Sequence, residues 1–323
     1  MSITRRFLTL ALALMPGFAG IAVAQSWPVK PVRVIVPLPP GSGTDITGRA
    51  IAQKLAAQLG QPFVVDNRPG ASGTIGVGLV ARAEPDGYTI LVHSSSWTVT
   101  PSTMTNLPFD TLKDIAGITM LANIPNVLVI KSGSRIGSVK DLVSAAKAKP
   151  GTINYATIGT GSATHLNAAR FQLGAGIDVV QVPYKGTPEA LTEVLAGRVE
   201  YCFCPVSNVL PFVKEGRLVA LAVGSSKRSS GLPDVPTTEE AGVPNSAYNF
   251  WVGMGIGAKT PRDIVKRLHA NTVEALQSPD IKSRWALLGQ DAQLFTPEQF
   301  DAYLRSDAST NATLVKAAGI KAN

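Results

Sequence analysis

Two short loops rich in glycine, serine and threonine limit most strongly how this chain can fold. The first is Pro39-Pro40-Gly41-Ser42-Gly43-Thr44-Asp45, and the second is Thr157-Ile158-Gly159-Thr160-Gly161-Ser162-Ala163-Thr164-His165. Each follows a β-rich run and precedes a helical pattern. A turn of small residues at the carboxyl end of a strand directs backbone N–H groups outward, and the next helix adds unpaired donors and a positive dipole end. Two such loops facing one another predict a site for a small carboxylate.

Neither loop matches a nucleotide-binding fingerprint. The Rossmann pattern needs a third glycine, which would fall at Ile46 for the first loop and at Thr164 for the second. A P-loop needs Gly-Lys followed by Ser or Thr, and the chain contains no such triplet. The sequence therefore argues against both dinucleotide and nucleoside triphosphate binding.

Strand and helix patterns alternate along the chain, which predicts sheets covered on both faces by helices, with ligand loops at the carboxyl ends of the strands. We expect the chain to leave a first lobe near residue 124 and to rejoin it near 236. This gives one lobe of residues 25–124 plus 236–323 and another of 125–235, hinged by two crossings. Strands are expected at 32–36, 62–65, 88–92, 127–130, 153–157, 179–182, 199–203, 218–223 and 250–256, and helices at 45–59, 72–83, 140–149, 162–173, 188–195 and 206–214.

The N-terminal 24 residues are typical of a secretory signal peptide. Arg5 and Arg6 form a basic start, residues 7–19 are largely apolar, and Ala22-Val23-Ala24 reads as a cleavage site. The alternative is a membrane anchor, but Pro16 and nearby glycines interrupt a run that is already short for a span. We expect a mature chain beginning at Gln25 in the periplasm, with the Sec and twin-arginine routes both open.

Composition narrows the classes of partner. The chain is 45% hydrophobic and 16% charged, as in globular proteins, and its formal net charge of +8 suits anionic ligands. No block of Lys and Arg with interleaved aromatic residues indicates nucleic acid binding, and no DNA-binding helix pair precedes Trp27. His93 and His269 are isolated, so neither a metal site nor a cofactor is predicted.

The chain has two cysteines, Cys202 and Cys204, within an expected strand. Residues two apart on a strand share a face, but their Cα atoms lie roughly 6.6 to 7 Å apart, at or beyond the limit for a disulfide. We therefore predict two reduced, buried thiols. A redox or metal-binding pair is the alternative.

Several loop side chains have more than one possible role. Ser162 and His165 are three residues apart, as a nucleophile and its base would be on a helix, which makes a secreted serine hydrolase the alternative function. The chain has no Gly-x-Ser-x-Gly elbow, so we interpret His165 as a tie between loop and core. Asp45 is expected to cap a helix or to hold its loop by accepting backbone N–H bonds. The loop glycines have two possible roles, since they could let a ligand approach the backbone or could serve as turn residues with positive φ. Four hydroxyl side chains could either cap a helix or contact the ligand: Ser42, Thr44, Ser162 and Thr164.

Eight short segments occur in order along the chain: Trp27 to Arg33; Val36-Pro37 with Pro40-Gly41 and Asp45; Asn67-Arg-Pro-Gly70; Pro85-Asp-Gly-Tyr-Thr89; Tyr155-Ala-Thr157 with Gly159, Gly161 and His165; Val182-Pro-Tyr-Lys-Gly186; Leu221-Ala222 with Lys227-Arg228; and Leu232 to Thr237 with Glu240-Ala241-Gly242. Together they closely resemble the periplasmic solute-binding receptors of tripartite tricarboxylate transporters (TctC/Bug-like), over essentially the whole chain after the leader.

The resemblance implies an α/β type II periplasmic binding-protein fold, with two lobes that each carry a central, mainly parallel sheet flanked by helices. It implies a monomeric receptor, not an enzyme, that needs no cofactor. Such a receptor captures a small mono-, di- or tricarboxylate, aromatic acids included, between its lobes. It then delivers the ligand to an integral membrane permease of one large and one small subunit.

Carried onto this chain, the resemblance places ligand contacts in both loops and at the ends of neighbouring strands. Two positions depart from the family's pattern. Gly41-Ser42 stands where a glycine pair is common, and Cys204 stands where an acidic residue is frequent, so a carboxylate contact is absent there. Lys185 is either pocket wall or exposed surface. The expected ligand-binding residues are Leu38, Gly41, Ser42, Gly43, Thr44, Asp45, Ser94, Ser95, Thr157, Gly159, Gly161, Ser162, Ala163, Thr164, His165, Tyr184 and Cys204.

Overall fold

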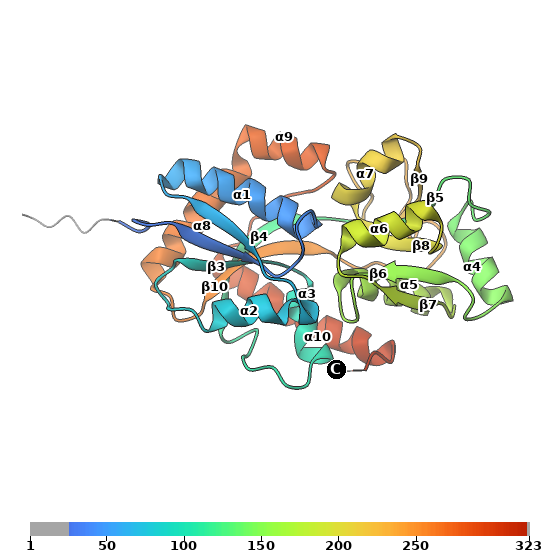
Figure 1. The fold of residues 1–323 in the computed structure, drawn as a ribbon, viewed down its shortest axis with the longest axis horizontal. Coiled ribbons are helices and arrows are strands. Elements are labelled where there is room, and N and C mark those ends of the chain that lie inside the picture. Colours follow the sequence, from blue (N-terminus) through green and yellow to red (C-terminus); the bar gives the residue numbers. More distant parts are fainter. Residues whose placement is uncertain (1–25, 322–323) are drawn as a thin grey trace, which may run out of the picture.

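The computed structural model describes residues 26–321, which form two lobes lying side by side (Figure 1). The expected signal peptide therefore lies outside the described residues. The first lobe contains a five-stranded sheet in the order β2-β1-β3-β10-β4. Its strands are β1 (Val32–Val36), β2 (Phe63–Asn67), β3 (Thr89–Ser94), β4 (Ile115–Asn123) and β10 (Trp251–Gly257).

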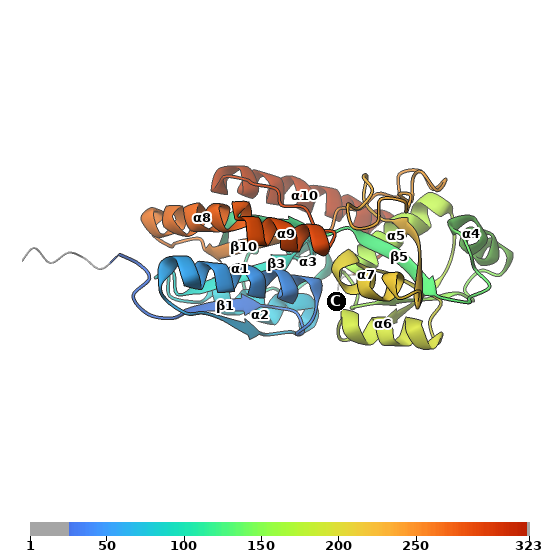
Figure 2. The same cartoon turned by 90° about the horizontal axis from the view of Figure 1, so that it is seen from above.

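Helices cover both faces of this first sheet (Figures 1 and 2). One face carries α1 (Gly43–Leu59), α8 (Arg262–Gln277) and α9 (Pro279–Leu287). The other carries a 3-10 turn (Ala71–Gly73), α2 (Thr74–Ala81), α3 (Ser96–Thr103) and α10 (Pro297–Ala317). Trp97, Trp251 and Phe300 are fully buried on this second face, so apolar burial fixes α3 and α10 to the sheet.

The second lobe repeats the plan with a sheet in the order β7-β6-β8-β5-β9. Side chains alternate across it: Leu128 and Ile130 pack under α4 and α5, whereas Val127 and Val129 pack under α6 and α7. The strands are β5 (Asn126–Lys131), β6 (Asn154–Thr157), β7 (Val180–Pro183), β8 (Tyr201–Pro205) and β9 (Leu218–Val223). The helices are α4 (Val139–Ala148), α5 (Ala163–Ala175), α6 (Thr187–Ala196) and α7 (Val206–Lys214).

The predicted fold class is confirmed, since each sheet is mainly parallel and flanked by helices. One strand in each sheet runs against its neighbours: β10 pairs antiparallel with β3 and β4, and β5 with β8 and β9. Strands β1 and β9 and helix α7 have the predicted bounds. The sequence reading did not assign β4 or α3.

The chain returns to the first lobe later than residue 236. Beyond Pro236 it still follows β9, because Val223 N–H donates to Pro236 O (2.7 Å) and Thr238 N–H donates to Val223 O (2.9 Å). Tyr248 N–H also donates to Gly224 O (2.7 Å). The segment 236–248 thus lies on the second sheet, and the second crossing falls between Tyr248 and β10. The expected boundary fell too early because this segment contains no helix or strand whose pattern would mark it.

The prediction of reduced thiols is wrong, because Cys202 and Cys204 form a disulfide in the structure. Their Cα atoms lie 5.5 Å apart, which is closer than an extended strand would place them and within the range a disulfide spans. Both side chains are buried.

Among residues 26–321, no helix is both long and apolar enough to cross a bilayer. Over the same stretch, no group of three or more His, Cys, Asp or Glu side chains is placed to hold a metal ion.

Candidate functional site

The two loops have the same local structure. Ser42 caps α1 and Ser162 caps α5, each hydroxyl accepting from the N–H three residues later, in Asp45 and His165, at 3.3 Å. The side chain of that later residue then reaches back and accepts from a glycine N–H. Asp45 Oδ2 accepts from Gly41 (2.9 Å), and His165 Nδ1 accepts from Gly161 (3.1 Å). The same pair of hydrogen bonds thus closes both loops and holds both helix starts in place.

Glycine is required in these loops for two different reasons. Gly41, Gly159 and Gly161 adopt positive φ, whereas Gly43 opens α1 and does not. A Cβ on Gly161 would also lie 2.8 Å from Thr103 Oγ1, and a Cβ on Gly43 would lie 3.3 Å from Pro205 Cβ. Gly43 is therefore needed for the close approach of the two lobes, not for its backbone conformation.

Asp45 holds its loop, as predicted. Its side chain is only 4% exposed and pairs with Arg49 Nη2 at 3.0 Å, while Asn67 Nδ2 donates to Oδ1 at 2.9 Å. Burial by itself would raise the pKa of Asp45, but the hydrogen bonds from Arg49, Gly41 and Asn67 lower it below its usual value. Asp45 is thus a carboxylate whose acceptor sites are already used, and it is compatible with a neighbouring anion only because Arg49 offsets its charge.

His165 ties its loop to the core, as interpreted from the sequence. Burial lowers its pKa from 6.5 to about 4, so the ring is neutral at pH 7. Because Nδ1 accepts from Gly161, the proton lies on Nε2. Ser162 Oγ donates to Gly159 O (2.7 Å) and accepts from His165 N–H, so the hydroxyl is engaged with backbone rather than with the imidazole. This geometry does not form the nucleophile and base pair of the hydrolase alternative.

Unpaired donors remain at both helix starts. Within residues 26–321 the N–H groups of Gly43 and Thr44 in α1, and of Thr164 in α5, make no hydrogen bond. Thr44 Oγ1 is buried without a partner, whereas Thr164 Oγ1 accepts from Ile158 N–H at 3.2 Å. Free N–H groups at the positive end of a helix dipole bind anions.

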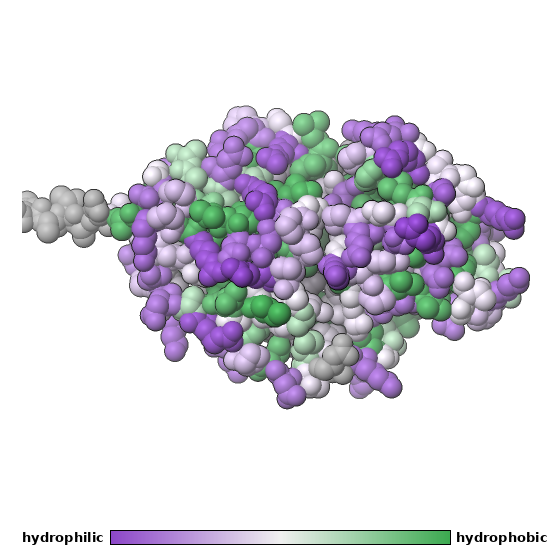
Figure 3. All heavy atoms as spheres, viewed as in Figure 1, coloured by the Kyte–Doolittle hydropathy of each residue, from purple (hydrophilic) through white to green (hydrophobic). Residues whose placement is uncertain are grey.

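The loops also join the lobes. Ala163 N–H, at the start of α5, donates to Ser96 Oγ (3.2 Å), and Ser72 Oγ donates to Thr160 O (3.0 Å). On the other side, Asn208 Nδ2 donates to Gly41 O (2.8 Å). The face shown in Figure 3 has residues of intermediate hydropathy where the lobes meet. Each glycine-rich loop therefore contacts the other lobe at the boundary between the lobes.

The other predicted site residues lie around these loops. Leu38 O accepts from Asn67 Nδ2 (2.9 Å), and Thr157 Oγ1 accepts from Gly159 N–H (3.2 Å). Ser94 and Ser95 are buried at the end of β3, close to Ser96. Tyr184 N–H donates to Thr157 O (2.8 Å), and Cys204 is bonded to Cys202 in the core. Direct ligand contact by each of these residues stays a prediction.

Sequence comparison decides the family. The sequence profile described as the tripartite tricarboxylate transporter family receptor matches residues 47–320. The chain belongs to this family. It is 35% identical to Protein BugT of Bordetella pertussis, over 99% of each chain.

Solved structures agree with this assignment. Rpa4515 of R. palustris with adipate is 30% identical, with a TM-score of 0.88 over 92% of this chain and 100% of its own. MatC of Rhodopseudomonas palustris with bound malate is 29% identical, with a TM-score of 0.83 over 90% of this chain and 100% of its own. These relatives are similar to the chain in both sequence and fold.

The sequence reading missed a set of buried polar side chains near the lobe boundary. Asn126, Asn167 and Ser207 each carry a buried polar atom with no hydrogen-bond partner in the described part of the chain. A signal was present for two of them. Asn126 begins an apolar strand, and Asn167 lies on the helical face that also carries Phe171. Asparagine at either position has to find a partner on burial.

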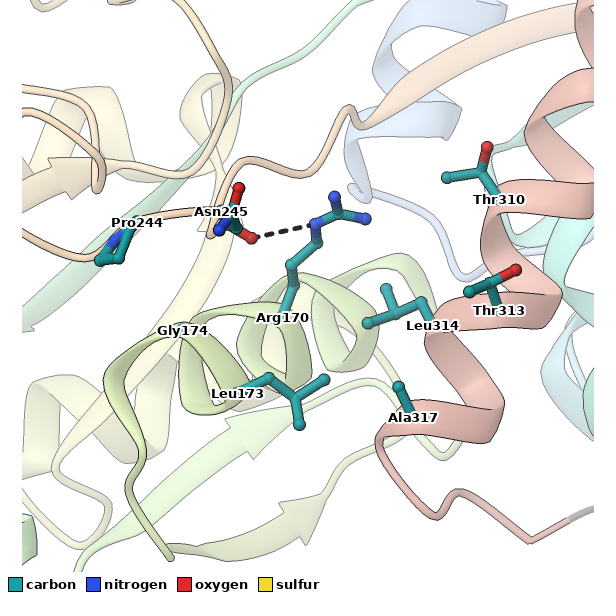
Figure 4. A pocket seen from close by; sticks show the side chains of 9 residues that line it. All are labelled: Arg170, Leu173, Gly174, Pro244, Asn245, Thr310, Thr313, Leu314 and Ala317. Carbon is teal, nitrogen blue, oxygen red and sulfur yellow. Dashed lines mark hydrogen bonds between the residues drawn. The ribbon is translucent and has the colours of Figure 1, made fainter.

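A hollow lies away from the loops. It measures about 590 Å³ and is bounded by α5, the turn at Pro244 and Asn245, and α10 (Figure 4). Arg170 extends into it from α5, with Nε donating to Asn245 O (3.2 Å), and Thr310 faces it from α10. Because α5 belongs to the second lobe and α10 to the first, this groove also spans the lobe boundary.

Proposed function

We propose that this chain is a periplasmic receptor that captures a small carboxylate between its two lobes and delivers it to the membrane permease of a tripartite tricarboxylate transporter. The observation that carries the proposal is the pair of glycine-rich loops, which start two helices and each lie at the lobe boundary with free N–H donors. Family membership and the adipate and malate bound to two relatives support it.

The carboxylate is held without a lysine or arginine from either loop. The N–H groups of Gly43, Thr44 and Thr164 and the hydroxyl of Thr44 are the donors, assisted by the positive ends of α1 and α5. Hydrogen bonds to a charged group contribute about 1.5 to 3 kcal/mol each, so a few such donors suffice for micromolar binding. Gly41, Gly159 and Gly161 shape the loops, and the remaining predicted residues line the same site.

The proposal includes export of the chain by its N-terminal segment. Residues 1–24 direct the chain to the periplasm and are removed, which leaves a receptor that binds and releases its ligand unchanged. The oxidising periplasm also suits the disulfide between Cys202 and Cys204. Ligand shifts open molecules toward the arrangement in which the lobes touch, by motion about the two crossings.

A thermal-shift screen of the mature protein tests the binding function. Carboxylic acids should raise the melting temperature, because a ligand that binds the folded state stabilises it. The matched controls are the methyl esters of the same acids, which lack the charge and should give no shift. A saturating acid should also reduce the radius of gyration in small-angle scattering. Acids that act no better than their esters would contradict the proposal.

A turnover assay separates the receptor from the hydrolase. The wild type should release no product from ester or amide substrates, and Ser162→Ala should behave identically in that assay. Steady hydrolysis by the wild type that is lost in Ser162→Ala would replace the receptor by the hydrolase.

A further inference from the structure

The side chains of Asn126 and Asn167 are fully buried, and neither the oxygen nor the nitrogen of either carboxamide has a hydrogen-bond partner among the described residues. A buried carboxamide left unpaired is strongly unfavourable, and in native proteins nearly all such groups are paired. Two fully unpaired carboxamides in one region therefore indicate that a further polar group binds there.

The two carboxamides lie at the same end of the second sheet. Asn126 starts β5 and, by the alternation of side chains, shares the face of Leu128 that α5 covers. Its carbonyl accepts from Gly224 N–H (2.7 Å). Asn167 lies on α5 directly over Gly224, since a Cβ on that glycine would lie 2.6 Å from Asn167 Nδ2. The glycine therefore makes room for one carboxamide and is hydrogen-bonded to the residue that carries the other.

This pair lies near the second glycine-rich loop. Asn167 is one helical turn beyond Ala163, whose N–H meets Ser96. Tyr248 is buried beside Ser95, and its N–H donates to Gly224 O (2.7 Å). Four residues of helix rise roughly 6 Å, which is within the length of a short acid held at the start of α5.

The chemistry of the pair suits a neutral group better than a second anion. A carboxamide donates and accepts hydrogen bonds but has no charge. Burial raises the pKa of the adjacent Tyr248 hydroxyl, the carboxyl group of Asp307 raises it further, and Arg170 lowers it less. Arg170 itself lies in the groove of Figure 4, where its Nε is bound to Asn245 O. A second carboxylate would be buried here without a cation on it, which is costly.

We propose that Asn126 and Asn167 bind the distal end of the ligand, and that this end is a neutral hydrogen-bonding group, a hydroxyl or a carboxamide. The substrates are then short hydroxy or amide monocarboxylates rather than dicarboxylates. This inference rests on the proposed function and narrows its ligand class.

Isothermal titration at pH 7 with two sets of acids, each of matched chain length, tests the inference. The series is adipate, its monoamide, 6-hydroxyhexanoate and hexanoate, with succinate, its monoamide and 4-hydroxybutanoate as the four-carbon set. In at least one set, the monoamide or the hydroxy acid should bind at least tenfold more tightly than the diacid. Hexanoate should also bind more weakly than its hydroxylated counterpart.

Two variants link the preference to the carboxamides. Asn167→Leu and Asn126→Leu keep the side-chain volume nearly unchanged, so each should retain binding of hexanoate while losing the preference for a polar distal end. Asn271→Leu is the matched control, because Asn271 lies on the exposed side of α8 and bonds Arg267 O. Asn167→Ser and Asn126→Ser replace any leucine variant whose circular dichroism shows that it has not folded.

The outcomes are distinct. Tightest binding of a diacid, or an unchanged order of affinities in folded variants of both asparagines, would overturn the inference and leave the receptor function standing. The second of these results would mean that the carboxamides hold structural water only. Failure of every acid in the series and in the thermal-shift screen would overturn the receptor function and this inference with it.

Discussion

The loop after β1 and the loop after β6 are closed by equivalent hydrogen bonds, yet the closing groups differ in charge. In the first, Asp45 is a carboxylate held by Arg49 and Asn67. In the second, His165 is a neutral imidazole whose pKa burial lowers to about 4. Equivalent geometry can therefore be built from a charged or an uncharged acceptor, provided that the charge is offset nearby.

The two loops also differ in what they leave free. The first keeps two N–H groups and the Thr44 hydroxyl unpaired, whereas the second uses the Thr164 hydroxyl within the loop and gives Ala163 N–H to Ser96. The second loop further accepts from Ser72 through Thr160 O. The comparison indicates that the first loop offers more free donors for a ligand, whereas the second loop makes more of the hydrogen bonds between the lobes.

The largest effect is expected for Gly161→Val, which disturbs the second loop. A Cβ there meets Thr103 of the other lobe, so the lobes cannot reach contact and affinity should fall about 100-fold, or 2.7 kcal/mol. Gly159→Val is the control, because its φ is also positive while open space surrounds the position. Titration calorimetry compares them. Equal losses in both variants would assign the effect to backbone strain and not to lobe contact.

Asp45→Asn tests the charged closure of the first loop. Asp45 accepts at both oxygens, from Gly41 and from Asn67, but an asparagine offers one acceptor and turns its amide toward a donor. The ion pair with Arg49 is lost as well, so the free energy of unfolding, measured in urea, should fall by about 2 kcal/mol. His165→Asn keeps an acceptor for Gly161 and should cost less at pH 7. A larger loss in His165→Asn than in Asp45→Asn would reverse the comparison.

Stability against pH separates the two closing groups further. The folded pKa of His165 is lowered below 6.5, so the unfolded chain binds the proton more readily and stability falls as pH drops below 6.5. Between pH 7 and 5.5 this amounts to about 1 kcal/mol. Asp45 does not titrate there, because its pKa is lowered from 3.8. His93 is fully buried and its pKa is lowered to about 3, so it adds a similar slope, and His165→Asn should remove about half of the combined pH dependence in urea unfolding at both pH values. An unchanged slope would mean that His165 binds its proton as readily in the folded state.

The smallest effect is expected for Lys185→Ala, outside both loops. Lys185 is exposed at the start of α6, and its N–H donates to Glu189. A rim charge acts through screened attraction, so affinity should fall less than threefold and only at low salt. Lys149→Ala, on a distant helix end, is the matched control in titrations at two salt concentrations. Abolished binding in Lys185→Ala would place the anion on this lysine and refute the comparison of the two loops.

The sequence predicts best what local chemistry decides. Small residues between an apolar run and a capped helix predict both loops, and Asp45 and His165 have the tying roles expected of them. Apolar period and capping likewise predict β1, α7 and β9. These features depend on residues a few positions apart, so a single sequence contains the information needed for them.

What the sequence did not predict depends on distant parts of the chain. The return crossing lies beyond Tyr248 because residues far from any periodic pattern pair with β9. Cys202 and Cys204 approach closely enough for a bond only through the local shape of β8. Asn126 and Asn167 are about forty residues apart in sequence, and both lie beside Gly224, which is roughly a hundred residues beyond Asn126. A single sequence does not show that these three residues are neighbours.

Helix α10 adds a mechanical consequence to the two-lobed plan. It belongs to the first lobe, where Asp307 accepts from Thr98 Oγ (2.6 Å), yet its last turns border α5 of the second (Figure 4). In the receptor that we propose, opening about the two crossings would also move α5 past α10. The groove around Arg170 would then change in width, so a fluorophore attached at Thr313 would report opening and closing from a position outside the predicted ligand site.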